Sequence, residues 1–547
     1  MATPQTHLPS TKVIIVGAGF SGLVMAYQLK QQLKCNEFVI YDRAASLGGT
    51  WLANTYPGCG VDVPAPFYSL SFAPNPDFTS LFPKQHEVLH YMNSVASKFD
   101  ISRHVKGDME WIGASFQEST KTWLVKLRNV ISEQEYIQEC NILVSAVGAL
   151  TNPKPINIHG IEHFQGKILH TARWDHDVAL ADKNVIVIGN GSSATQLIPA
   201  IAPKVQSITQ FIRSPQYYFP GNPLAITPFW RNIFRYVPGM LRLIRLLIFL
   251  YLETSVLQFN LTTTGKRLRG EARERSNNYI KRCAPRKYWN LLLPTANVGC
   301  KRRVFDHDGY IPCLNRDNVH LTDDPITSIS HHSVQTQSGQ TYPADVIVLA
   351  NGFTPTHFDV DLRGRHGRSQ HEHWKDFGYI EAYESVAMSG FPNFFYVLGP
   401  NSGRGYTSAI YSVESASVEP KLSSERAYND RLHTALGNTV NTNACRSWYI
   451  DDRTGKNWAI YPWGSLYMWY TTHVAGLDDW IYDVPQRPAR SGEKTLVLPM
   501  VMSTVLAFLA LVLYILLPGD VIGEKWIHYV SSYVPSEHLF STVQKLN

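Results

Sequence analysis

The sequence predicts an α/β fold built on two Rossmann-like dinucleotide-binding units. Residues 12–22 (KVIIVGAGFSG) form an apolar run followed by a G-x-G-x-x-G turn, the pattern of a strand leading into a phosphate-binding helix. Residues 184–194 (NVIVIGNGSSA) repeat the pattern with alanine in the last position. The length of 547 residues also exceeds what one hydrophobic core normally organises. The sequence therefore predicts at least two domains and two bound dinucleotides.

In the first unit, a helix is expected over residues 23–33 and a second strand over residues 38–42. That strand ends in Asp42, 20 residues after Gly22, the spacing at which an acid reaches a ribose hydroxyl. Glycines in the turn let the backbone approach a pyrophosphate at the helix N-terminus. These features together predict a complete nucleotide site.

In the second unit, the strand predicted over residues 207–213 ends in Arg213. An NAD site would have an acid at this position, whereas a guanidinium pairs with the 2′-phosphate of NADP. Arg213 therefore favours NADPH over NADH, the alternative being that it is an ordinary surface residue.

Three further segments combine polar, aromatic and glycine residues at defined spacings. Residues 48–64 read GGTWLANTYPGCGVDVP, and residues 164–175 read FQGKILHTARWD. Residues 298–306 read VGCKRRVFD. By composition alone, the first is a loop, the second a packed linker and the third a solvated turn.

Taken in order, these segments and the two glycine turns resemble the type I Baeyer–Villiger monooxygenases, a branch of the flavin-containing monooxygenases. The resemblance spans about residues 10–480. Two positions depart from the family pattern, because Arg303 stands where proline is usual and Asn351 where threonine is more frequent. The resemblance implies FAD and NADPH as cofactors, and insertion of one oxygen atom from O2 into a ketone through a flavin C4a-peroxide.

The resemblance also implies roles for individual residues. Arg302 is expected to stabilise the peroxide and polarise the ketone carbonyl, with Asp62 pairing to it and Lys301 beside it in the same segment. His170 and Trp174 are expected to couple the position of NADP to the domain arrangement. The expected cofactor-binding residues are Gly17, Gly19, Phe20, Ser21, Gly22, Asp42, Gly49, Thr50, Trp51, Tyr56, Asp62, Gly189, Gly191, Ser192, Ser193, Ala194, Arg213, Gly399 and Asn401.

The predicted domain organisation is discontinuous. The FAD-binding domain is assigned to 1–150 and 336–490, the NADPH-binding domain to 151–214 and 291–335, a helical insertion to 215–290, a transmembrane anchor to 495–517 and a tail to 518–547. Within the insertion, an apolar helix over 239–252 is interrupted by Arg242 and Arg245, and could pack on the core, line a substrate entrance or lie in a membrane interface. Residues 445–479 contain Trp448, Trp458, Trp463 and Trp469, which either belong to the core or cover a hydrophobic pocket.

The C-terminal region predicts a membrane anchor. Residues 495–517 (TLVLPMVMSTVLAFLALVLYILL) are uncharged and long enough to cross a bilayer core of about 30 Å. Arg487, Arg490 and Lys494 precede this segment, so the positive-inside rule places the catalytic part in the cytosol. We expect a single-pass C-terminal anchor in the endoplasmic reticulum. A bulky hydrophobic ketone from secondary metabolism is the expected substrate.

Composition excludes several other classes. A net charge of +6 from 50 basic and 44 acidic residues indicates no nucleic-acid surface. Seven scattered cysteines without C-x-x-C argue against a disulfide framework, a metal site and a dithiol redox centre. The N-terminus has no signal-peptide pattern. Two other functions stay open at this stage: a related flavin monooxygenase oxidising N, S or C centres, and a membrane-tethered NADPH oxidase or inactive partner. Oligomeric state is not predicted.

Overall fold

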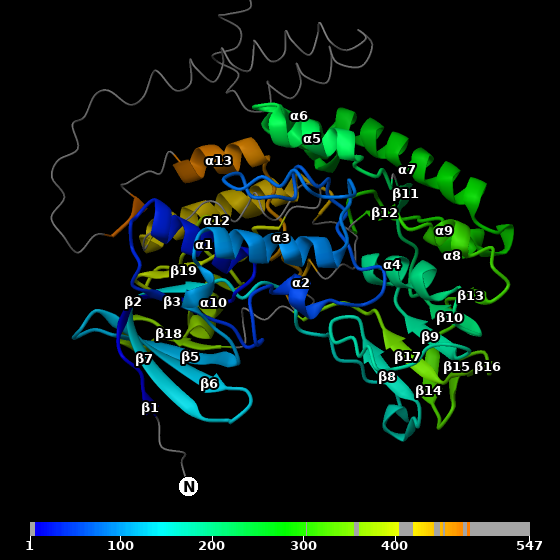
Figure 1. The fold of residues 1–547 in the computed structure, drawn as a ribbon, viewed down its shortest axis with the longest axis horizontal. Coiled ribbons are helices and arrows are strands. Elements are labelled where there is room, and N and C mark those ends of the chain that lie inside the picture. The colour runs from blue at the N-terminus through cyan, green and yellow to red at the C-terminus, as the bar shows by residue number, and fades with distance from the viewer. Residues whose placement is uncertain are drawn as a thin grey trace, which may run out of the picture.

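The computed structural model of the chain has two main sheets, each with helices packed against it, beneath a layer of longer helices (Figure 1). It describes residues 6–221, 223–301, 303–354, 360–403, 420–441, 449–451, 454–473 and 479–481.

The first sheet has nine strands and receives chain from two distant parts of the sequence. Its central strands are parallel and run in the order β7-β2-β3-β4, while β5, β6 and β7 form an antiparallel extension. The strands of this sheet are β1 (Thr6–His7), β2 (Thr11–Val16), β3 (Phe38–Tyr41), β4 (Val105–Lys106), β5 (Met109–Gln117), β6 (Thr122–Asn129), β7 (Glu135–Ser145), β18 (Asp361–Arg363) and β19 (Phe394–Tyr396). β19 returns to pair in parallel with β7.

The second sheet is entirely parallel, in the order β13-β10-β9-β17-β8. Its strands are β8 (Lys167–His170), β9 (Asn184–Ile188), β10 (Ser207–Phe211), β13 (Val319–Thr322) and β17 (Val346–Leu349). All four residues of β17 (VIVL) are buried, as expected for a strand covered on both faces. Two small sheets accompany it: β11 (Tyr218–Pro220) with β12 (Val304–Asp306), and β14 (Ile326–Ile329) with β15 (Ser333–Thr336) and β16 (Thr341–Pro343).

Helices begin where strands of both sheets end. α1 (Phe20–Gln31) follows β2 and α4 (Ser192–Ile201) follows β9. α1 starts three residues before the predicted position, so the last residues of the glycine turn form its first helical turn. The other helices of the two units are α2 (Thr50–Ala53), α3 (Gln85–Lys98), α9 (Tyr310–Cys313), α10 (Gln370–Phe377), α12 (Leu422–Gly437) and α13 (Ser465–His473).

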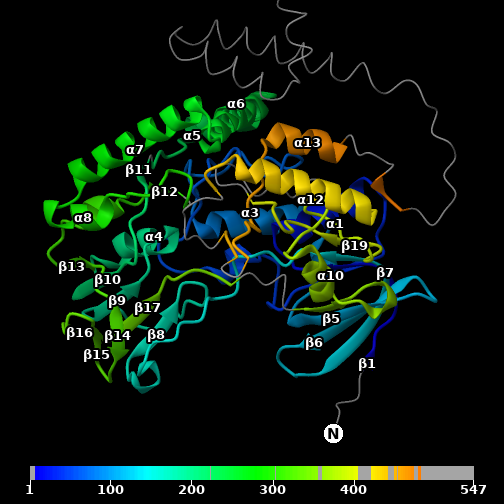
Figure 2. The ribbon, with the colours of Figure 1, turned by 180° about the vertical axis from the view of Figure 1, so that it is seen from behind.

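A helical insertion covers one end of the molecule in both views (Figures 1 and 2). It contains α5 (Pro228–Tyr236), α6 (Met240–Thr254), the 3-10 helix η3 (Ser255–Phe259), α7 (Thr263–Cys283) and α8 (Trp289–Leu292). The helix predicted over 239–252 is therefore present as α6. Shorter 3-10 helices occur at η1 (Ser102–His104), η2 (Ile161–His163), η4 (Arg286–Tyr288) and η5 (Arg365–Gly367).

The α/β prediction with two Rossmann-like units is confirmed. The two units share one buried apolar cluster, which includes Val13 and Ile15 of β2 together with Val185 and Val187 of β9. None of the described helices is long and apolar enough to cross a membrane. The predicted anchor at 495–517 lies outside the described residues.

Candidate active site

The first glycine turn is compressed against neighbouring backbone. Gly17 has φ +109°, and a Cβ there would lie 2.3 Å from the Ala146 carbonyl oxygen. A Cβ on Gly22 would lie 2.0 Å from the Gly17 carbonyl oxygen. Since side chains are excluded at both positions, only backbone lines this side of the turn. No side chain caps the N-terminus of α1, so its terminal N–H groups are suited to a phosphate.

Asp42 is fixed at this turn. Its two carboxylate oxygens accept hydrogen bonds from the backbone N–H groups of Ala18 (2.7 Å) and Ala44 (2.8 Å). Burial raises the pKa of Asp42, and these two hydrogen bonds act in the opposite direction. A carboxylate has about four acceptor sites. Asp42 therefore retains acceptor capacity for a ribose hydroxyl.

The glycine-rich loop at 48–64 meets the first turn directly. Gly49 has φ +52°, and a Cβ on it would lie 2.7 Å from the Gly19 Cα. Thr50 starts α2, and the buried Trp51 donates a hydrogen bond from Nε1 to the Tyr68 hydroxyl at 3.1 Å. The fold thus brings two separately predicted cofactor segments together as one backbone cradle, which fits FAD.

The same loop reaches the second nucleotide unit. The Tyr56 hydroxyl donates to Gln196 Oε1 at 2.7 Å, and Gln196 Nε2 donates to the Gly60 carbonyl at 3.0 Å. A Cβ on Gly58 would lie 2.2 Å from the Gln196 carbonyl oxygen. Gln196 lies on α4, so these contacts hold the glycine-rich loop of the first unit against the second nucleotide unit. No sequence pattern pointed to Gln196.

The second glycine turn has the same construction, with an open end. Gly189 has φ +123°, and a Cβ there would lie 2.3 Å from the Ala350 carbonyl oxygen. Among the described residues, nothing lies within 4 Å of the position of a Cβ on Gly191, and no side chain caps the N-terminus of α4. Ser192, Ser193 and Ala194 form the first turn of α4, in which the two serines are partly exposed and Ala194 is buried in the core. The arrangement fits the pyrophosphate of NADP.

Lys301 lies beside Arg213 at the carboxyl end of β10. Its Nζ donates to the Ser214 hydroxyl and to the Pro215 carbonyl (3.4 Å). Burial lowers the pKa of Lys301, and the positive charge of Arg213 lowers it further. Two cations held near each other at the end of this strand are suited to a doubly charged phosphate. Lys301 was predicted to act beside Arg302 in catalysis, and that role stays a prediction. Adjacency in the chain does not reveal that the Lys301 side chain points toward Ser214.

His170 is held in one orientation by its neighbours. Nδ1 accepts from the Ala172 N–H at 3.0 Å, and Nε2 lies 3.0 Å from Asn351 Oδ1. Burial lowers the pKa of His170, so a neutral ring that donates from Nε2 satisfies both contacts.

Asn351, which departs from the family pattern, in turn donates to the Lys154 carbonyl at 3.1 Å. Trp174 is partly buried against the main core cluster.

Asp62 is partly buried on the loop that follows Val61. Its negative charge acts on His307, whose pKa is lowered by burial and raised by Asp62. Lys84 pairs with Asp308 and donates to the Gly58 carbonyl at 3.2 Å, which ties this loop to the segment after β12. Arg302 lies outside the described residues, so its pairing with Asp62 stays a prediction.

Gly399 and Asn401 form the turn after β19. A Cβ on Gly399 would lie 2.4 Å from the Ser385 carbonyl oxygen. Asn401 has φ +57°, and its side chain donates to the carbonyls of Asn457 (2.8 Å) and Ile460 (3.3 Å). The described contacts of the Asn401 side chain therefore position the loop at 457–460.

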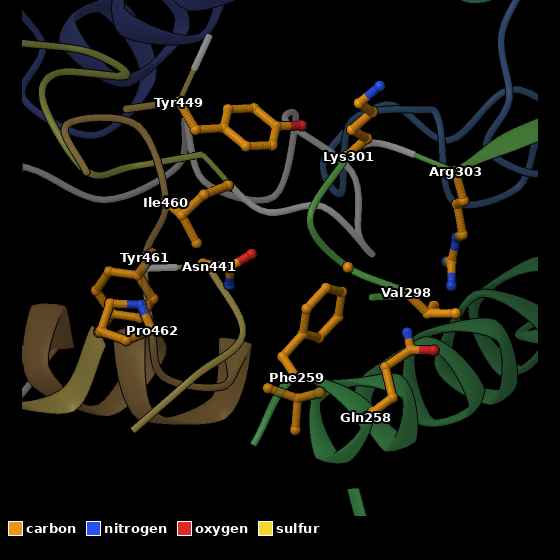
Figure 3. Close-up of a pocket in the computed structure, with 12 residues that line it drawn as sticks. Gln258, Phe259, Val298, Lys301, Arg303, Asn441, Tyr449, Ile460, Tyr461 and Pro462 are labelled. Carbon is orange, nitrogen blue, oxygen red and sulfur yellow. The ribbon is translucent and has the colours of Figure 1, made fainter. Parts of the chain in front are cut away.

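That loop forms part of a pocket (Figure 3). The pocket is lined by apolar and aromatic side chains with two cationic groups at its edge: Val256, Gln258, Phe259, Val298, Gly299, Lys301, Arg303, Asn441, Tyr449, Ile460, Tyr461 and Pro462. The sequence singled out tryptophans in this region, but Trp458 and Trp463 pack against the core. Tyr449 and Tyr461 line the pocket instead, together with Phe259 from η3. No sequence pattern linked η3 to residues 441–462.

One cysteine beside this pocket departs from expectation. Cys300 is disulfide-bonded, although the scattered cysteines argued against a disulfide framework. The other described cysteines are free thiols. Spacing along the chain does not show which distant residues the fold brings together.

Comparison with known proteins agrees with this geometry. Residues 15–84 match the model of an NAD(P)-binding Rossmann-like domain. The chain is 34% identical over 488 residues to a Baeyer–Villiger monooxygenase of Streptomyces coelicolor, covering 84% of this chain and 90% of that protein. It is 32% identical over 472 residues to a Baeyer–Villiger monooxygenase of Pseudomonas aeruginosa, covering 82% and 87%.

Solved structures show the same fold. Cyclohexanone monooxygenase from Rhodococcus sp. Phi1 bound to NADP+ superimposes with a TM-score of 0.72 at 25% identity, covering 87% of this chain and 98% of that one. OTEMO in complex with FAD and NADP gives a TM-score of 0.73 at 22% identity, covering 86% and 99%. The two glycine turns, the loop joining them and the extended sequence identity lead to one assignment: the chain belongs to the Baeyer–Villiger monooxygenases, a family of FAD- and NADPH-dependent flavin monooxygenases.

Proposed function

We propose that this enzyme inserts one oxygen atom from O2 into a bulky apolar ketone of secondary metabolism, giving an ester or lactone. The observation that supports this most directly is the position of Lys301. It lies against Ser214 beside Arg213 and also lines the apolar pocket, so one short segment joins the nucleotide site to the pocket. Ketone and nicotinamide cofactor would therefore bind on either side of residues 300–303.

The lining of the pocket is complementary to an apolar carbonyl compound. Phe259, Tyr449 and Tyr461 supply aromatic surface, while Arg303 supplies a cationic group at the edge. Pockets for small molecules are typically apolar, with a few placed polar groups that fix orientation. A ketone has one strong hydrogen-bond acceptor on an otherwise apolar skeleton. It therefore matches a pocket with aromatic walls and a cationic group at the edge.

Bound FAD and NADPH would supply activated oxygen and hydride to this site. The chain itself supplies orientation and charge. Arg302 would hold negative charge at the reacting oxygen and polarise the ketone carbonyl, since a guanidinium stays protonated and presents a fixed set of donors. Asp62 would balance that charge. His170, neutral and fixed by Ala172 and Asn351, would hold the end of β8 in register with β17.

Membrane attachment is the second part of the proposal. We infer that residues 495–517 form a single-pass anchor in the endoplasmic reticulum, with the catalytic part in the cytosol, because the segment is uncharged and bases precede it. Alkaline extraction and protease protection of microsomes test both points. Release of the full chain by alkaline carbonate would contradict the anchor.

The catalytic test uses the full chain in detergent with NADPH, O2 and a panel of bulky cyclic ketones. We expect a product heavier by one oxygen atom that base hydrolyses to a hydroxy acid. Arg302→Ala should abolish the product, while Arg363→Ala, at an exposed arginine paired with Asp361, should not. Oxygen found on nitrogen, sulfur or an unactivated carbon would assign the enzyme to related flavin monooxygenases. NADPH consumption with only hydrogen peroxide formed from every ketone would indicate an oxidase.

A further inference from the structure

Helices α5 and α6 expose an apolar surface unlike the rest of the described chain. Nine of the seventeen exposed large hydrophobic side chains among the described residues fall between residues 224 and 251. Phe229, Tyr236 and Tyr251 are 65%, 71% and 69% exposed. We define the α5–α6 face by six of these side chains: Phe229, Trp230, Tyr236, Leu243, Leu247 and Tyr251. Both views place α5 and α6 next to each other along the upper side of the molecule (Figures 1 and 2).

The packing of α6 leaves this face outward. Phe249 and Leu250 are buried in a small cluster with Phe67, with the rings of Phe67 and Phe249 6.1 Å apart. Leu243, Leu247 and Tyr251 recur at four-residue intervals on the exposed side. A helix lying between core and water normally has a polar outer side, so two apolar sides indicate a second apolar neighbour. α5 has no buried residue.

Charge indicates what that neighbour is. Residues 223–252 contain four arginines and no acidic residue. Two of them fasten the helices to the first unit, because Arg235 pairs with Asp77 and Arg245 donates to the carbonyls of Pro66 and Ser69. Arg242 is exposed on α6. Apolar and aromatic side chains interspersed with arginine, without acids, are typical of helices in the interface of an anionic bilayer.

The chain also limits the distance to a bilayer. Residues 482–494 connect the last described residue, Ile481, to the uncharged segment at 495–517. Thirteen extended residues span at most about 45 Å. If 495–517 is the anchor, the catalytic part stays within about that distance of the membrane, and the α5–α6 face can reach it.

The same helix leads into the pocket. α6 ends at Thr254 and continues directly as η3, in which Val256 and Phe259 line the pocket (Figure 3). Only four residues, 252–255, separate the exposed Tyr251 from Val256. Leu466 packs against both the cluster of Phe249 and Leu250 and the cluster of Val256 and Leu257, so apolar side chains continue from the buried side of α6 to the pocket wall.

We propose that the α5–α6 face lies in the interface of an anionic bilayer and admits the ketone to the pocket from the lipid. The docking itself is independent of the reaction, whereas delivery of the ketone rests on the proposed function. Two experiments separate the two parts.

Photocrosslinking tests the docking. A benzophenone amino acid is placed at Phe229 or Tyr251 of the full chain in vesicles of phosphatidylcholine with phosphatidylserine. Matched controls carry it at Leu33 or Ile131, which are 71% and 76% exposed and lie outside the insertion. We expect lipid adducts from the first pair only, and fewer in vesicles of phosphatidylcholine alone. Adducts to residues 482–547, to a second copy, or at the level of the controls would overturn the proposal.

Kinetics test the delivery. In the combined variant Leu243→Gln, Leu247→Gln and Tyr251→Gln, the packed side of α6 is unchanged. We expect KM for a ketone partitioned into the vesicles to rise about tenfold, with kcat and the KM for a water-soluble ketone unchanged. Equal effects on both ketones would mean that the face is structural and would refute delivery. If the unmodified enzyme oxygenates no ketone, the proposed function fails while the crosslinking result still stands.

Discussion

The paired cations at the end of β10 give a direct test of cofactor choice. Lys301→Ala should raise KM for NADPH about 10- to 100-fold, since a hydrogen bond between charged groups contributes about 1.5–3 kcal/mol. The effect with NADH should be much smaller, because NADH has no 2′-phosphate. Lys204→Ala, at an exposed lysine elsewhere on the same unit, is the matched control. Equal losses with both nucleotides would assign Lys301 to catalysis, as its place beside Arg302 first suggested.

Glu384 is a buried acid that should make stability depend on pH. Burial raises its pKa to about 7, although a hydrogen bond with Thr471 (3.2 Å) and the charge of Arg431 act in the other direction. The Thr471 hydroxyl also donates to the Met468 carbonyl at 3.2 Å, so a protonated Glu384 could donate to Thr471. A raised carboxyl pKa means that the folded state binds this proton more tightly than the unfolded state does.

The stability from Glu384 should therefore be fully present below about pH 4.5 and decrease as pH rises to about 7. A shift of this size corresponds to about 3 kcal/mol of unfolding free energy. Glu384→Gln should remove this decrease of the unfolding free energy with pH and should stabilise the protein at pH 8. Denaturant unfolding at a series of pH values measures both effects. Glu274→Gln, at an exposed carboxyl on α7, is the control. An unchanged slope in Glu384→Gln would exclude Glu384 as its source.

At the scale of elements, the contact between the two loops predicted to bind FAD leaves the least room for a side chain. Gly49→Ala would place a methyl group 2.7 Å from the Gly19 Cα, so one backbone must move. We expect the purified variant to retain less than about a tenth of the normal flavin, because a 1 Å displacement is large on the scale of a binding site. Flavin absorbance per protein measures this.

Gly309→Ala provides the control for strain alone. Gly309 has φ +76°, but nothing lies within 4 Å of its added Cβ. Both variants impose a positive φ on alanine. Gly309 lies in the left-handed α region (ψ +38°), whereas Gly49 lies outside it (ψ −121°), and only Gly49→Ala adds the collision. Equal flavin loss in the two variants would show that backbone strain, and not the contact between the loops, is responsible.

Elements encoded locally were predictable from sequence, whereas contacts between distant segments were not. The turns at Gly17 and Gly189 follow apolar strands, and strand, turn and helix are continuous in the chain. The contact between Lys301 and Ser214 was not predictable, because the two residues are 87 positions apart in the chain. A pocket covered by residues 445–479 was one of two alternatives, but its wall from η3 was not predictable, since η3 and residues 449–462 meet only in the folded chain. Asn351 was recognised as a departure from the family pattern. Its contact with His170 was not predictable, because it depends on the pairing of β17 with β8.

At the scale of the whole molecule, the two nucleotide units are joined by a shared core and by specific polar contacts. Tyr56 reaches Gln196 on α4, and Lys84 pairs with Asp308. Any relative movement of the units must break these contacts, because they cross between the units. Tyr56 and Lys84 both belong to segment 56–84. A change in the arrangement of the two units would therefore move this segment, which contains residues predicted to bind FAD.

The return of β19 to the first sheet also has a consequence during synthesis. β7 pairs with β19, whose Phe394 lies opposite Leu143. Ribosomes add roughly 5–20 residues per second, so β7 waits on the order of 10–50 seconds for this partner. All strands of the second sheet lie between residues 167 and 349 and emerge within that interval. The nascent chain should therefore complete its internal unit before its N-terminal one, with an apolar strand edge exposed to chaperones until the C-terminal half leaves the ribosome.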